Sequence, residues 1–290
     1  MYRITPIKQV LNIRSIVTIH YFELSKNFTY PGESHDFWEM VYVDKGEVII
    51  TADDKEFVLR QGEAVFHEPN EFHKIAANNV IAPNVFIISF VCKSREMNFF
   101  RKKVTVVPTK LRDLIALVIE EAQKNYRLPF FDPHLKKLMA SEHPPIGGEQ
   151  MIRMYLEQFL ILTLRSDVIA KESRVPIMNE SLDDRLVQDI IQYLENRVYQ
   201  TVSVSELCKH FNYSKTYLSK VFKNVTGRSL LEYYTSLKIS AAKRLIREKD
   251  YNFAQIAAQL CYDSPQYFSR TFKHVTGMTP KEYKNSVKTG

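Results

Sequence analysis

The chain has 290 residues, of which 45% are hydrophobic and 25% are charged, proportions that are ordinary for a soluble globular protein of two domains. It has no apolar run long enough to cross a membrane, and its N-terminus lacks the pattern of a signal peptide. The net charge of +7 arises entirely within residues 181–290, which contain 17 Lys and Arg against 10 Asp and Glu. A basic surplus confined to one domain indicates either a polyanionic partner or a merely solvated basic surface.

The first part of the chain predicts short strands separated by turns. Runs rich in β-branched and aromatic residues mark strands at 17–22, 38–43, 47–51, 56–59, 64–67 and 85–90. Gly, Pro, Asn and Asp gather between these runs, as is typical of turns. Many short strands at even spacing favour a small antiparallel β-barrel or a double-sheet jelly roll.

The hydrophobic period then becomes helical in two segments, near 109–126 and 149–165. Two amphipathic helices that follow a barrel either cover it or form a dimer interface; we favour the interface and keep the covering role open. A polar stretch at 171–178 predicts the linker. Every segment from Leu182 onward predicts helix. We therefore expect a two-domain α+β protein, with a barrel and its trailing helices at 1–175 and an all-α domain at 182–288.

The all-α domain contains one motif twice, offset by 50 residues. Tyr217-Leu-Ser-Lys-Val-Phe-Lys223, followed by Asn-Val-Thr-Gly227, reappears as Tyr267-Phe-Ser-Arg-Thr-Phe-Lys273, followed by His-Val-Thr-Gly277. Basic and small polar residues fill the gaps between apolar residues at helical spacing. A doubled small helical unit with a basic face suits a partner that offers two similar sites, such as a nucleic-acid duplex. A helical repeat that serves protein contacts is the weaker alternative.

Each copy predicts a helix-turn-helix, whose second helix is built to lie in the major groove of DNA. In the first copy a helix near 204–210 is followed by a turn at Asn212 and by a helix that Ser214 caps. In the second copy the turn falls at Cys261, and Ser264 caps the next helix. We expect the following residues to face DNA: Lys215, Thr216, Ser219, Lys220, Lys223, Gln266, Ser269, Arg270 and Lys273.

The segment between the copies, 230–247, contains neither Pro nor Gly and predicts one continuous helix. Such a helix would be about 27 Å long, close to one turn of the duplex, so the two reading helices can enter successive major grooves. Gln pairs well with adenine and Arg with guanine, whereas Lys suits phosphates. The second copy, with Gln266 and Arg270, is therefore expected to contribute at least as much sequence discrimination as the first.

These residues resemble the DNA-binding domain of the AraC/XylS family of bacterial transcription regulators. The matching positions are Ser214, Tyr217, Leu218, Ser219, Phe222, Lys223, Gly227, Lys238, Ala242, Leu245, Ile256, Ala257, Tyr267, Phe268, Ser269, Arg270, Phe272, Lys273, Gly277, Pro280 and Tyr283. The resemblance implies base contacts at Thr216, Ser219, Lys220, Gln266 and Arg270. The family usually has Gly at both turns, where this chain has Asn212 and Cys261. It usually has Ala and Arg at the positions where this chain has Cys208 and Lys238.

The barrel region is similar to the cupin-type sensor domain that is common in this family. The first motif is His35-Asp-Phe-Trp-Glu39 with Gly46, and the second comprises Gly62, Pro69 and His73. This resemblance implies an effector pocket inside the barrel, suited to a sugar or a similar polar metabolite. The candidate lining residues are His35, Phe37, Glu39, Phe66 and His73, whereas ordinary structural roles are expected for His20, His67 and Trp38.

Cupin enzymes hold a metal with two His spaced by one residue, a Glu and a later His, but here Glu33 occupies the first His position. The remaining set of Glu33, His35, Glu39 and His73 could bind a divalent ion. A metal-free pocket, in which these groups are hydrogen-bonded, is the expectation because the usual ligand set is incomplete. We therefore expect no cofactor and no metal.

The sequence thus predicts a transcription regulator that reads promoter DNA and responds to a small-molecule effector. A homodimer is expected, with RNA polymerase as a further partner of an activator, and no membrane partner. A metal-dependent cupin enzyme with an accessory helical domain and a non-specific architectural DNA binder are the alternatives. The three widely spaced cysteines, Cys92, Cys208 and Cys261, predict reduced core thiols in a cytoplasmic protein. The family resemblance implies that this protein is bacterial and is not an enzyme.

Overall fold

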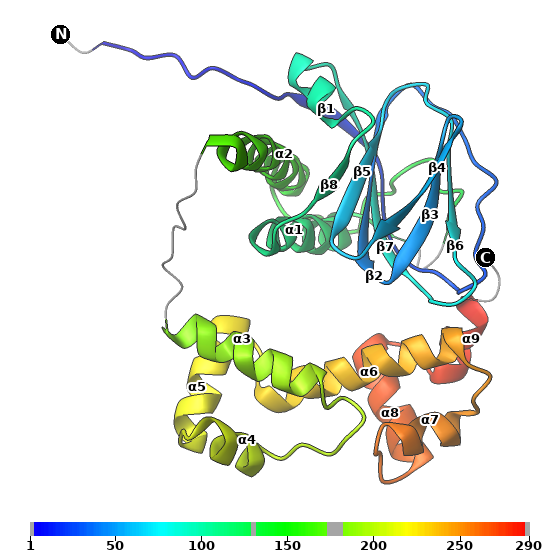
Figure 1. Ribbon diagram of the computed structural model, residues 1–290, viewed down its shortest axis with the longest axis vertical. Helices are drawn as coiled ribbons and strands as arrows, with labels where there is room; N and C mark the ends of the chain where they lie inside the picture. The colour runs from blue at the N-terminus through cyan, green and yellow to red at the C-terminus, as the bar shows by residue number, and fades with distance from the viewer. Residues whose placement is uncertain (1–2, 129–131, 173–181, 288–290) are drawn as a thin grey trace. The chain divides into compact units, whose positions relative to one another are not determined.

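The computed structural model describes residues 3–128, 132–172 and 182–287, which form two compact units that part at residues 174 and 175 (Figure 1). The linker predicted at 171–178 overlaps the end of a helix at 171–172, and its remainder lies outside the described residues. Each unit has its own hydrophobic cores.

The first unit contains two antiparallel sheets. The five-stranded sheet has the order β1 (Ile13–Glu23), β7 (Asn84–Cys92), β2 (Trp38–Lys45), β5 (Glu63–His67) and β8 (Val104–Val106). The three-stranded sheet has the order β4 (Lys55–Arg60), β3 (Glu47–Ala52) and β6 (His73–Ala77). The antiparallel, cupin-like architecture is confirmed, but among the described residues the two sheets do not close into one barrel, because no ladder of hydrogen bonds joins them. Of the two sequence alternatives, the double-sheet arrangement is the observed one.

The five-stranded sheet is buried on both faces. One face packs against the three-stranded sheet around a core that includes Val41, Ile50 and Val85. The other packs against α1 (Thr109–Asn125) and α2 (Gly148–Glu172), which lie on the opposite side of the sheet from β3, β4 and β6 (Figure 1). Both helices therefore cover this face of the sheet, the role that the sequence analysis kept open. A short 3₁₀ helix, Arg95–Phe100, joins β7 to β8.

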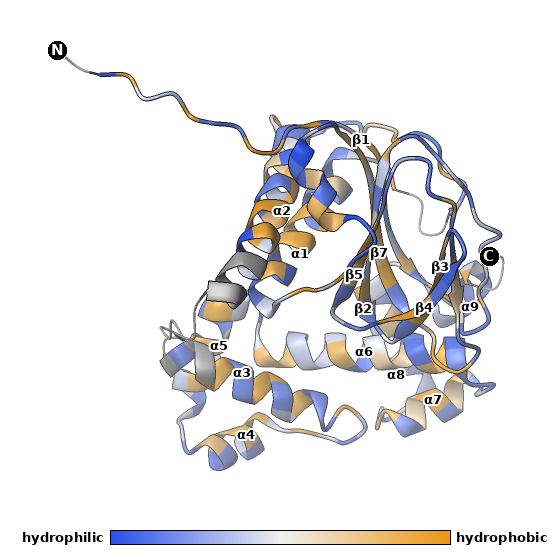
Figure 2. Cartoon of the chain, turned by 45° about the horizontal axis from the view of Figure 1, so that its top comes forward, coloured by the Kyte–Doolittle hydropathy of each residue, from blue (hydrophilic) through white to orange (hydrophobic). Residues whose placement is uncertain are grey.

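The second unit is entirely helical within its described residues. Its elements are α3 (Leu182–Glu195), α4 (Val204–Phe211), α5 (Lys215–Thr226), α6 (Leu230–Glu248), α7 (Phe253–Gln259), α8 (Pro265–Thr276) and α9 (Pro280–Ser286). Pairs α4–α5 and α7–α8 are the two predicted helix-turn-helix units, and the double helix-turn-helix domain is confirmed. Hydrophobic and hydrophilic stretches alternate along these helices, as amphipathic helices require (Figure 2).

Helix α6 belongs to both halves of this unit. Its first turns contribute Leu230 and Tyr234 to a core with α3, α4 and α5. Its later turns contribute Ile239, Ala242 and Leu245 to a second core with α7, α8 and α9. A capping box at Ser229 and Glu232 fixes where the helix begins. One rigid helix therefore sets the separation of the two helix-turn-helix units.

The turns of the two units share a strained conformation. Asn212 and Cys261 have φ angles of 58° and 54°, in the left-handed region that favours Gly. Asn tolerates this region better than other residues. Cys261 has no such intrinsic tolerance, although its Sγ donates a hydrogen bond of 3.3 Å to the carbonyl of Tyr199. Of the three cysteines expected in cores, Cys92 is buried, Cys208 is half-buried and Cys261 is exposed. The expectation of core thiols was therefore wrong for Cys261, because a turn residue projects its side chain outward.

Lys238 ties the middle of α6 to the end of α7. Its side chain is only 8% exposed, and its Nζ donates a hydrogen bond of 2.7 Å to the carbonyl of Leu260, the residue that ends α7. The positive charge thus lies at the negative end of a helix dipole. Burial lowers the pKa of Lys238 below its ordinary value. The bond fastens the end of α7, the first helix of the second helix-turn-helix, to α6.

Replacing Cys261 by Gly is expected to raise the free energy of unfolding by up to about 1 kcal/mol. Relief of the left-handed strain is worth about 1–2 kcal/mol, and the greater freedom of Gly in the unfolded chain offsets about 0.4–1 kcal/mol of it. Denaturant unfolding of the full chain measures the difference. Cys261→Ala is the control, because it keeps the strained backbone and should not stabilise; equal gains from both variants would contradict the explanation.

Lys238→Met is expected to lower the free energy of unfolding by about 1.5–3 kcal/mol, because it retains the apolar stem but leaves the Leu260 carbonyl without its charged donor. The matched control is Lys249→Met, at the exposed residue that follows α6. Urea titration of the full chain provides the measurement. A loss no larger than that of the control would show that the buried bond contributes no net stability.

Candidate functional site

The second helix of each helix-turn-helix begins at a serine that satisfies its first free N–H groups. Ser214 accepts a hydrogen bond of 3.3 Å from the backbone N–H of Tyr217, and Ser264 accepts one of 3.1 Å from that of Tyr267. Pro265 occupies the first position of α8, where its missing N–H costs nothing. Both caps were predicted from the sequence, and both are confirmed.

The buried faces of α5 and α8 leave a polar face exposed on each helix. Leu218 and Phe222 anchor α5 in its core, and Phe268 and Phe272 do the same for α8. Seven of the nine residues predicted to face DNA are exposed, namely Lys215, Thr216, Lys220, Lys223, Gln266, Arg270 and Lys273. Ser219 and Ser269, at equivalent positions of the two helices, are half-buried. Two matching polar faces are therefore available to a partner.

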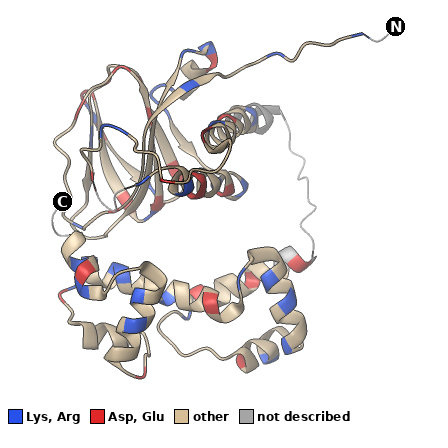
Figure 3. Ribbon diagram, turned by 180° about the vertical axis from the view of Figure 1, so that it is seen from behind, with Lys and Arg blue, Asp and Glu red and all other residues tan. Residues whose placement is uncertain are grey.

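The surroundings of these faces are basic but not uniformly so. Lys and Arg are spread over the helices of this unit, with fewer acidic residues between them (Figure 3). One acidic group lies close to the first face, because the Tyr217 hydroxyl donates a hydrogen bond of 2.9 Å to Asp183 on α3. Tyr213 stacks on Tyr217, with ring centroids 5.0 Å apart. Sequence patterns had not indicated the bond from Tyr217 to Asp183, because it depends on the packing of α3 against α5.

A second candidate site is a cavity of about 330 Å³ between the two sheets of the first unit. Its apolar walls come from residues such as Phe28, Ile50, Ile75 and Ile87. Its polar walls come from Thr18, His20, Tyr30, Glu33, His35, Glu39, His67, His73 and Ser89. Residues 133–136, from the connection between α1 and α2, complete the lining. The cavity is thus apolar over one part and polar over another, which suits an organic ligand that carries polar groups.

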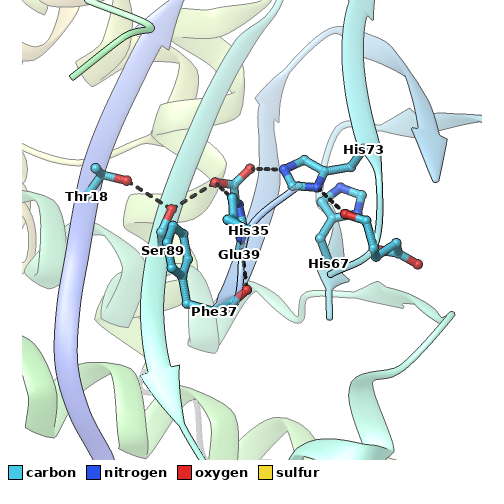
Figure 4. Close-up of polar contacts among 8 residues, drawn as sticks. Thr18, His35, Phe37, Glu39, His67, His73 and Ser89 are labelled. Carbon is cyan, nitrogen blue, oxygen red and sulfur yellow. Dashed lines mark hydrogen bonds and ion pairs between the residues drawn. The ribbon is translucent and has the colours of Figure 1, made fainter. Parts of the chain in front are cut away.

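The polar part is built by the register of the five-stranded sheet. Ser89 on β7 lies opposite both Thr18 on β1 and Glu39 on β2, and Glu39 in turn lies opposite His67 on β5. Four adjacent strands therefore place one polar residue each in a single row. Thr18 donates a hydrogen bond of 2.9 Å to Ser89, and Ser89 donates one of 2.8 Å to Glu39, so the row is joined as well as aligned (Figure 4).

Two further histidines approach Glu39 from outside this row (Figure 4). His73 begins β6 of the other sheet, and its Nε2 lies 3.4 Å from Glu39 Oε1. His35 precedes β2, and its Nε2 lies 3.6 Å from Glu39 Oε2. In each ring the Nδ1 atom lies 3.1 Å from a backbone carbonyl, that of Glu71 or Phe37. A carbonyl only accepts, so each Nδ1 carries a proton and each Nε2 faces the carboxylate.

The charges of this cluster follow from its contacts. Burial acts to raise the pKa of Glu39, but His35, His73 and Ser89 outweigh it and hold the pKa below its ordinary value, so Glu39 is a carboxylate. Burial acts to lower the pKa of His73, but Glu39 outweighs it and raises the pKa. The pKa of His67 is lowered, chiefly by burial, although Glu71 opposes the shift across a contact of 2.8 Å. The cluster thus holds one buried carboxylate in the ionised form by surrounding it with imidazoles and a hydroxyl.

The structure brings together most of the predicted pocket. His35, Phe37, Glu39 and His73 all line the cavity, but Phe66 does not. Phe66 is 1% exposed and packs in the core on the helix side of the sheet, because neighbouring residues of a strand point to opposite faces. The same alternation places His67 in the cavity, where the sequence analysis expected only a structural role. The lining residues His20, Thr18 and Ser89 were also missed, although strand alternation places Thr18 and His20 on one face of β1.

The residues that could hold a cation are the four considered from the sequence. One ligand atom from each of Glu33, His35, Glu39 and His73 lies within 4.8 Å of the others. The two imidazole Nε2 atoms are buried and have no hydrogen-bond partner among the described residues. Imidazole nitrogen and carboxylate oxygen are ordinary ligands of divalent ions, so the residue types of this set are compatible with one.

Comparisons with known proteins agree with both halves of this description. The Helix-turn-helix domain family matches residues 207–286, and the Cupin domain family matches residues 20–88. The HTH-type transcriptional regulator YfiF of Bacillus subtilis is 22% identical over 248 residues, which make up 83% of this chain and 75% of YfiF. The regulatory protein SoxS of Escherichia coli is 30% identical over 82 residues, or 28% of this chain and 77% of SoxS.

Among solved structures, ToxT of Vibrio cholerae aligns with 94% of this chain and 97% of its own, at 14% identity and a TM-score of 0.34. No helix within the described part of the chain combines the length and the apolar composition of a membrane span. The family matches and the relatives, taken with the two helix-turn-helix units and the cupin-like sheets, show that the chain belongs to the AraC/XylS family of DNA-binding transcription regulators with an N-terminal sensor domain.

Proposed function

We propose that this regulator reads promoter DNA with α5 and α8 in successive major grooves, and that an effector in the sensor cavity controls this reading. The observation that carries the first part is the pair of matching polar faces mounted on one helix, α6, which is buried in both halves of the unit. With 19 residues, α6 is about 28 Å long, close to the rise of one duplex turn.

The two faces are proposed to divide the work of recognition. On α8, Gln266 and Arg270 are one helical turn apart and exposed, and both side chains can make paired hydrogen bonds to base edges. On α5, Thr216 and Ser219 offer hydroxyls and Lys220 a point charge, which suits weaker base contacts. Lys215, Lys223, Ser269 and Lys273 are proposed to contact the backbone, where they fix the register of the protein on DNA.

The effector proposal rests on the cavity. Its volume of about 330 Å³ suits a small metabolite, and its lining combines an apolar wall with a joined polar row. His35, Phe37, Glu39 and His73 are the proposed contacts retained from the sequence, joined now by His67 and Ser89. A sugar or a similar polar metabolite satisfies the polar wall with its hydroxyls. An effector acts only if it favours one arrangement of the protein over another.

The remaining features of the proposal follow from this role. In this proposal the protein catalyses no reaction and acts as a homodimer in the bacterial cytoplasm. If it activates transcription, RNA polymerase is a further partner. The domain limits proposed from the sequence, 1–175 and 182–288, assign sensing to the first unit and DNA reading to the second. The relatives named above are transcriptional regulators, which favours this role over that of a cupin enzyme.

Gln266→Ala combined with Arg270→Ala is expected to remove base discrimination at the half-site that α8 reads. Each paired contact is worth about 1–3 kcal/mol, so affinity for the specific site should fall by at least about tenfold while non-specific affinity changes little. A mobility-shift assay on the upstream DNA measures both. Gln259→Ala, at an exposed residue of α7, is the control. Wild-type binding by the double variant would contradict the assignment.

Ile75→Trp is expected to abolish the effector response by filling the cavity from β6. A metabolite screen by thermal unfolding identifies compounds that raise the melting temperature of the wild type, since a ligand of the native state stabilises it. A true effector should give no such shift with Ile75→Trp and a full shift with Val58→Trp, which introduces the same side chain at an exposed position of β4. Equal shifts in both variants would place the binding site outside the cavity.

A further inference from the structure

The first unit contains another cavity, of about 310 Å³, for which the proposed function has no use. One wall is the turn between β3 and β4, and the other walls come from β4, β5 and the residues that lead into β8. Because β4 and β8 are edge strands of their sheets, we call it the edge cavity. None of its described lining residues lines the sensor cavity, so the two cavities are separate.

One part of the edge cavity is apolar. The residues that form it are Phe57 on β4, Val65 and Phe66 on β5, and Val104 on β8. Val65 and Phe66 are buried in the two cores of the unit, which fixes this wall. Val104 is 40% exposed, and an apolar group that covered it would remove apolar surface from water, which is favourable.

The turn that forms the opposite wall is held by two hydrogen bonds. The backbone N–H of Asp53 donates one of 2.8 Å to the carbonyl of Phe72, and the Asp53 carboxylate accepts one of 3.1 Å from the N–H of Phe72. Glu71, the preceding residue, lines the same cavity. The hairpin and the loop that carries Glu71 are thus joined before a ligand binds, which lowers the entropic cost of binding.

Glu71 places a buried carboxylate in the wall of the edge cavity. It is only 7% exposed, and its Oε2 lies 2.8 Å from Nδ1 of His67, a residue of the sensor cavity. Burial lowers the pKa of His67, so this partner is a neutral imidazole at neutral pH. No ion pair joins Glu71 to a lysine or an arginine within the described part of the chain. A buried carboxylate without a cation is costly, so this wall favours a ligand that brings a positive charge.

The lining also carries positive charges, and these lie nearer to water. Lys55 and Lys102 are exposed, whereas Lys103 is half-buried, with its Nζ 3.8 Å from the centre of the Phe99 ring. Together with three acidic residues, these lysines give the lining three side chains of each sign. A lining of mixed sign favours a ligand that carries both charges over one with a large net charge.

We propose that the edge cavity binds a free amino acid with an apolar side chain. At neutral pH such a molecule has an ammonium and a carboxylate group on the same carbon. The ammonium pairs with Glu71 at the buried wall, and the carboxylate pairs with Lys55 or Lys102 at the exposed rim. The apolar side chain packs on Phe57 and Val104. This site is additional to the sensor cavity, and its occupation does not depend on the DNA contacts proposed above.

The test uses the full chain without DNA and the common amino acids as probes. Thermal unfolding is expected to show that an apolar amino acid, such as leucine, valine or phenylalanine, raises the melting temperature, since a ligand of the native state stabilises it. Titration calorimetry with the same amino acid should give one site per chain. Absence of a shift with every amino acid would overturn the proposal.

Two analogues of the bound amino acid separate the roles of its charges. One is the amine that lacks the carboxylate, and the other is the carboxylic acid that lacks the ammonium. The amine should keep more of the affinity, because Glu71 is buried whereas Lys55 and Lys102 are exposed and screened by water. An acid analogue that binds as tightly as the amino acid would contradict the assigned pairing.

Variants locate the amino acid within the chain. Glu71→Gln keeps an oxygen that can accept a hydrogen bond from His67 but removes the charge, and it should weaken binding by at least about tenfold. Its control is Glu56→Gln, at an exposed residue of β4 that does not line the cavity, and this variant should bind as the wild type does.

Val104→Trp should abolish binding by filling the edge cavity from β8. Val106→Trp is its matched control, because it introduces the same side chain on the same strand, at a residue that is 70% exposed and lies outside the lining. Should Glu71→Gln fail to fold, the two valine variants decide alone. Unchanged affinity in Val104→Trp would refute the site.

Discussion

The DNA-reading unit depends on a single helix that is buried twice. Because α6 supplies apolar residues to two separate cores, neither helix-turn-helix can shift along it without exposing part of its core. Burial at both ends explains why 230–247 contains neither Pro nor Gly, since a kink would change the separation of the two reading helices. The hydrogen bond from Lys238 to Leu260 fixes the second helix-turn-helix to the middle of α6. Packing in two cores thus keeps the two helix-turn-helix units at a fixed separation.

The two reading helices are alike in structure and different in chemistry. Both begin at a serine cap, and both end at a glycine in the left-handed conformation. Their cores use equivalent positions, so the backbone of one repeats that of the other. The exposed residues are free to differ because packing does not constrain them. A duplicated scaffold can therefore carry two unequal surfaces, one richer in hydroxyls and lysines and one with Gln266 and Arg270.

The sensor unit is organised around a buried and paired carboxylate, that of Glu39. Strand β2 lies in the middle of the five-stranded sheet, with one face towards α1 and α2 and the other towards the cavity. Glu39 is the residue of this strand at which the cavity face becomes polar. A buried carboxylate is costly unless it is paired, and here hydroxyls and imidazoles from three other strands and a loop surround it. The same groups that keep Glu39 ionised form the polar wall of the cavity.

The sequence alone determined the features that depend on local spacing. The repeat, the caps at Ser214 and Ser264, the turns at Asn212 and Cys261 and the buried faces of the helices follow from helical periodicity and turn chemistry, which act over a few residues. Six strands were predicted for the same reason. Strands β6 and β8 were missed because they are short, and His73–Ala77 lacks the run of β-branched residues that marks a strand.

Only the tertiary structure decided how residues far apart in the chain meet. Whether α1 and α2 cover the sheet or remain open to a partner depends on packing that no local pattern encodes. The polar row was invisible for the same reason, because Thr18, Glu39 and Ser89 are aligned by strand register rather than by spacing. Register also placed His67, and not Phe66, in the cavity, since a shift of one residue along a strand moves a side chain to the opposite face.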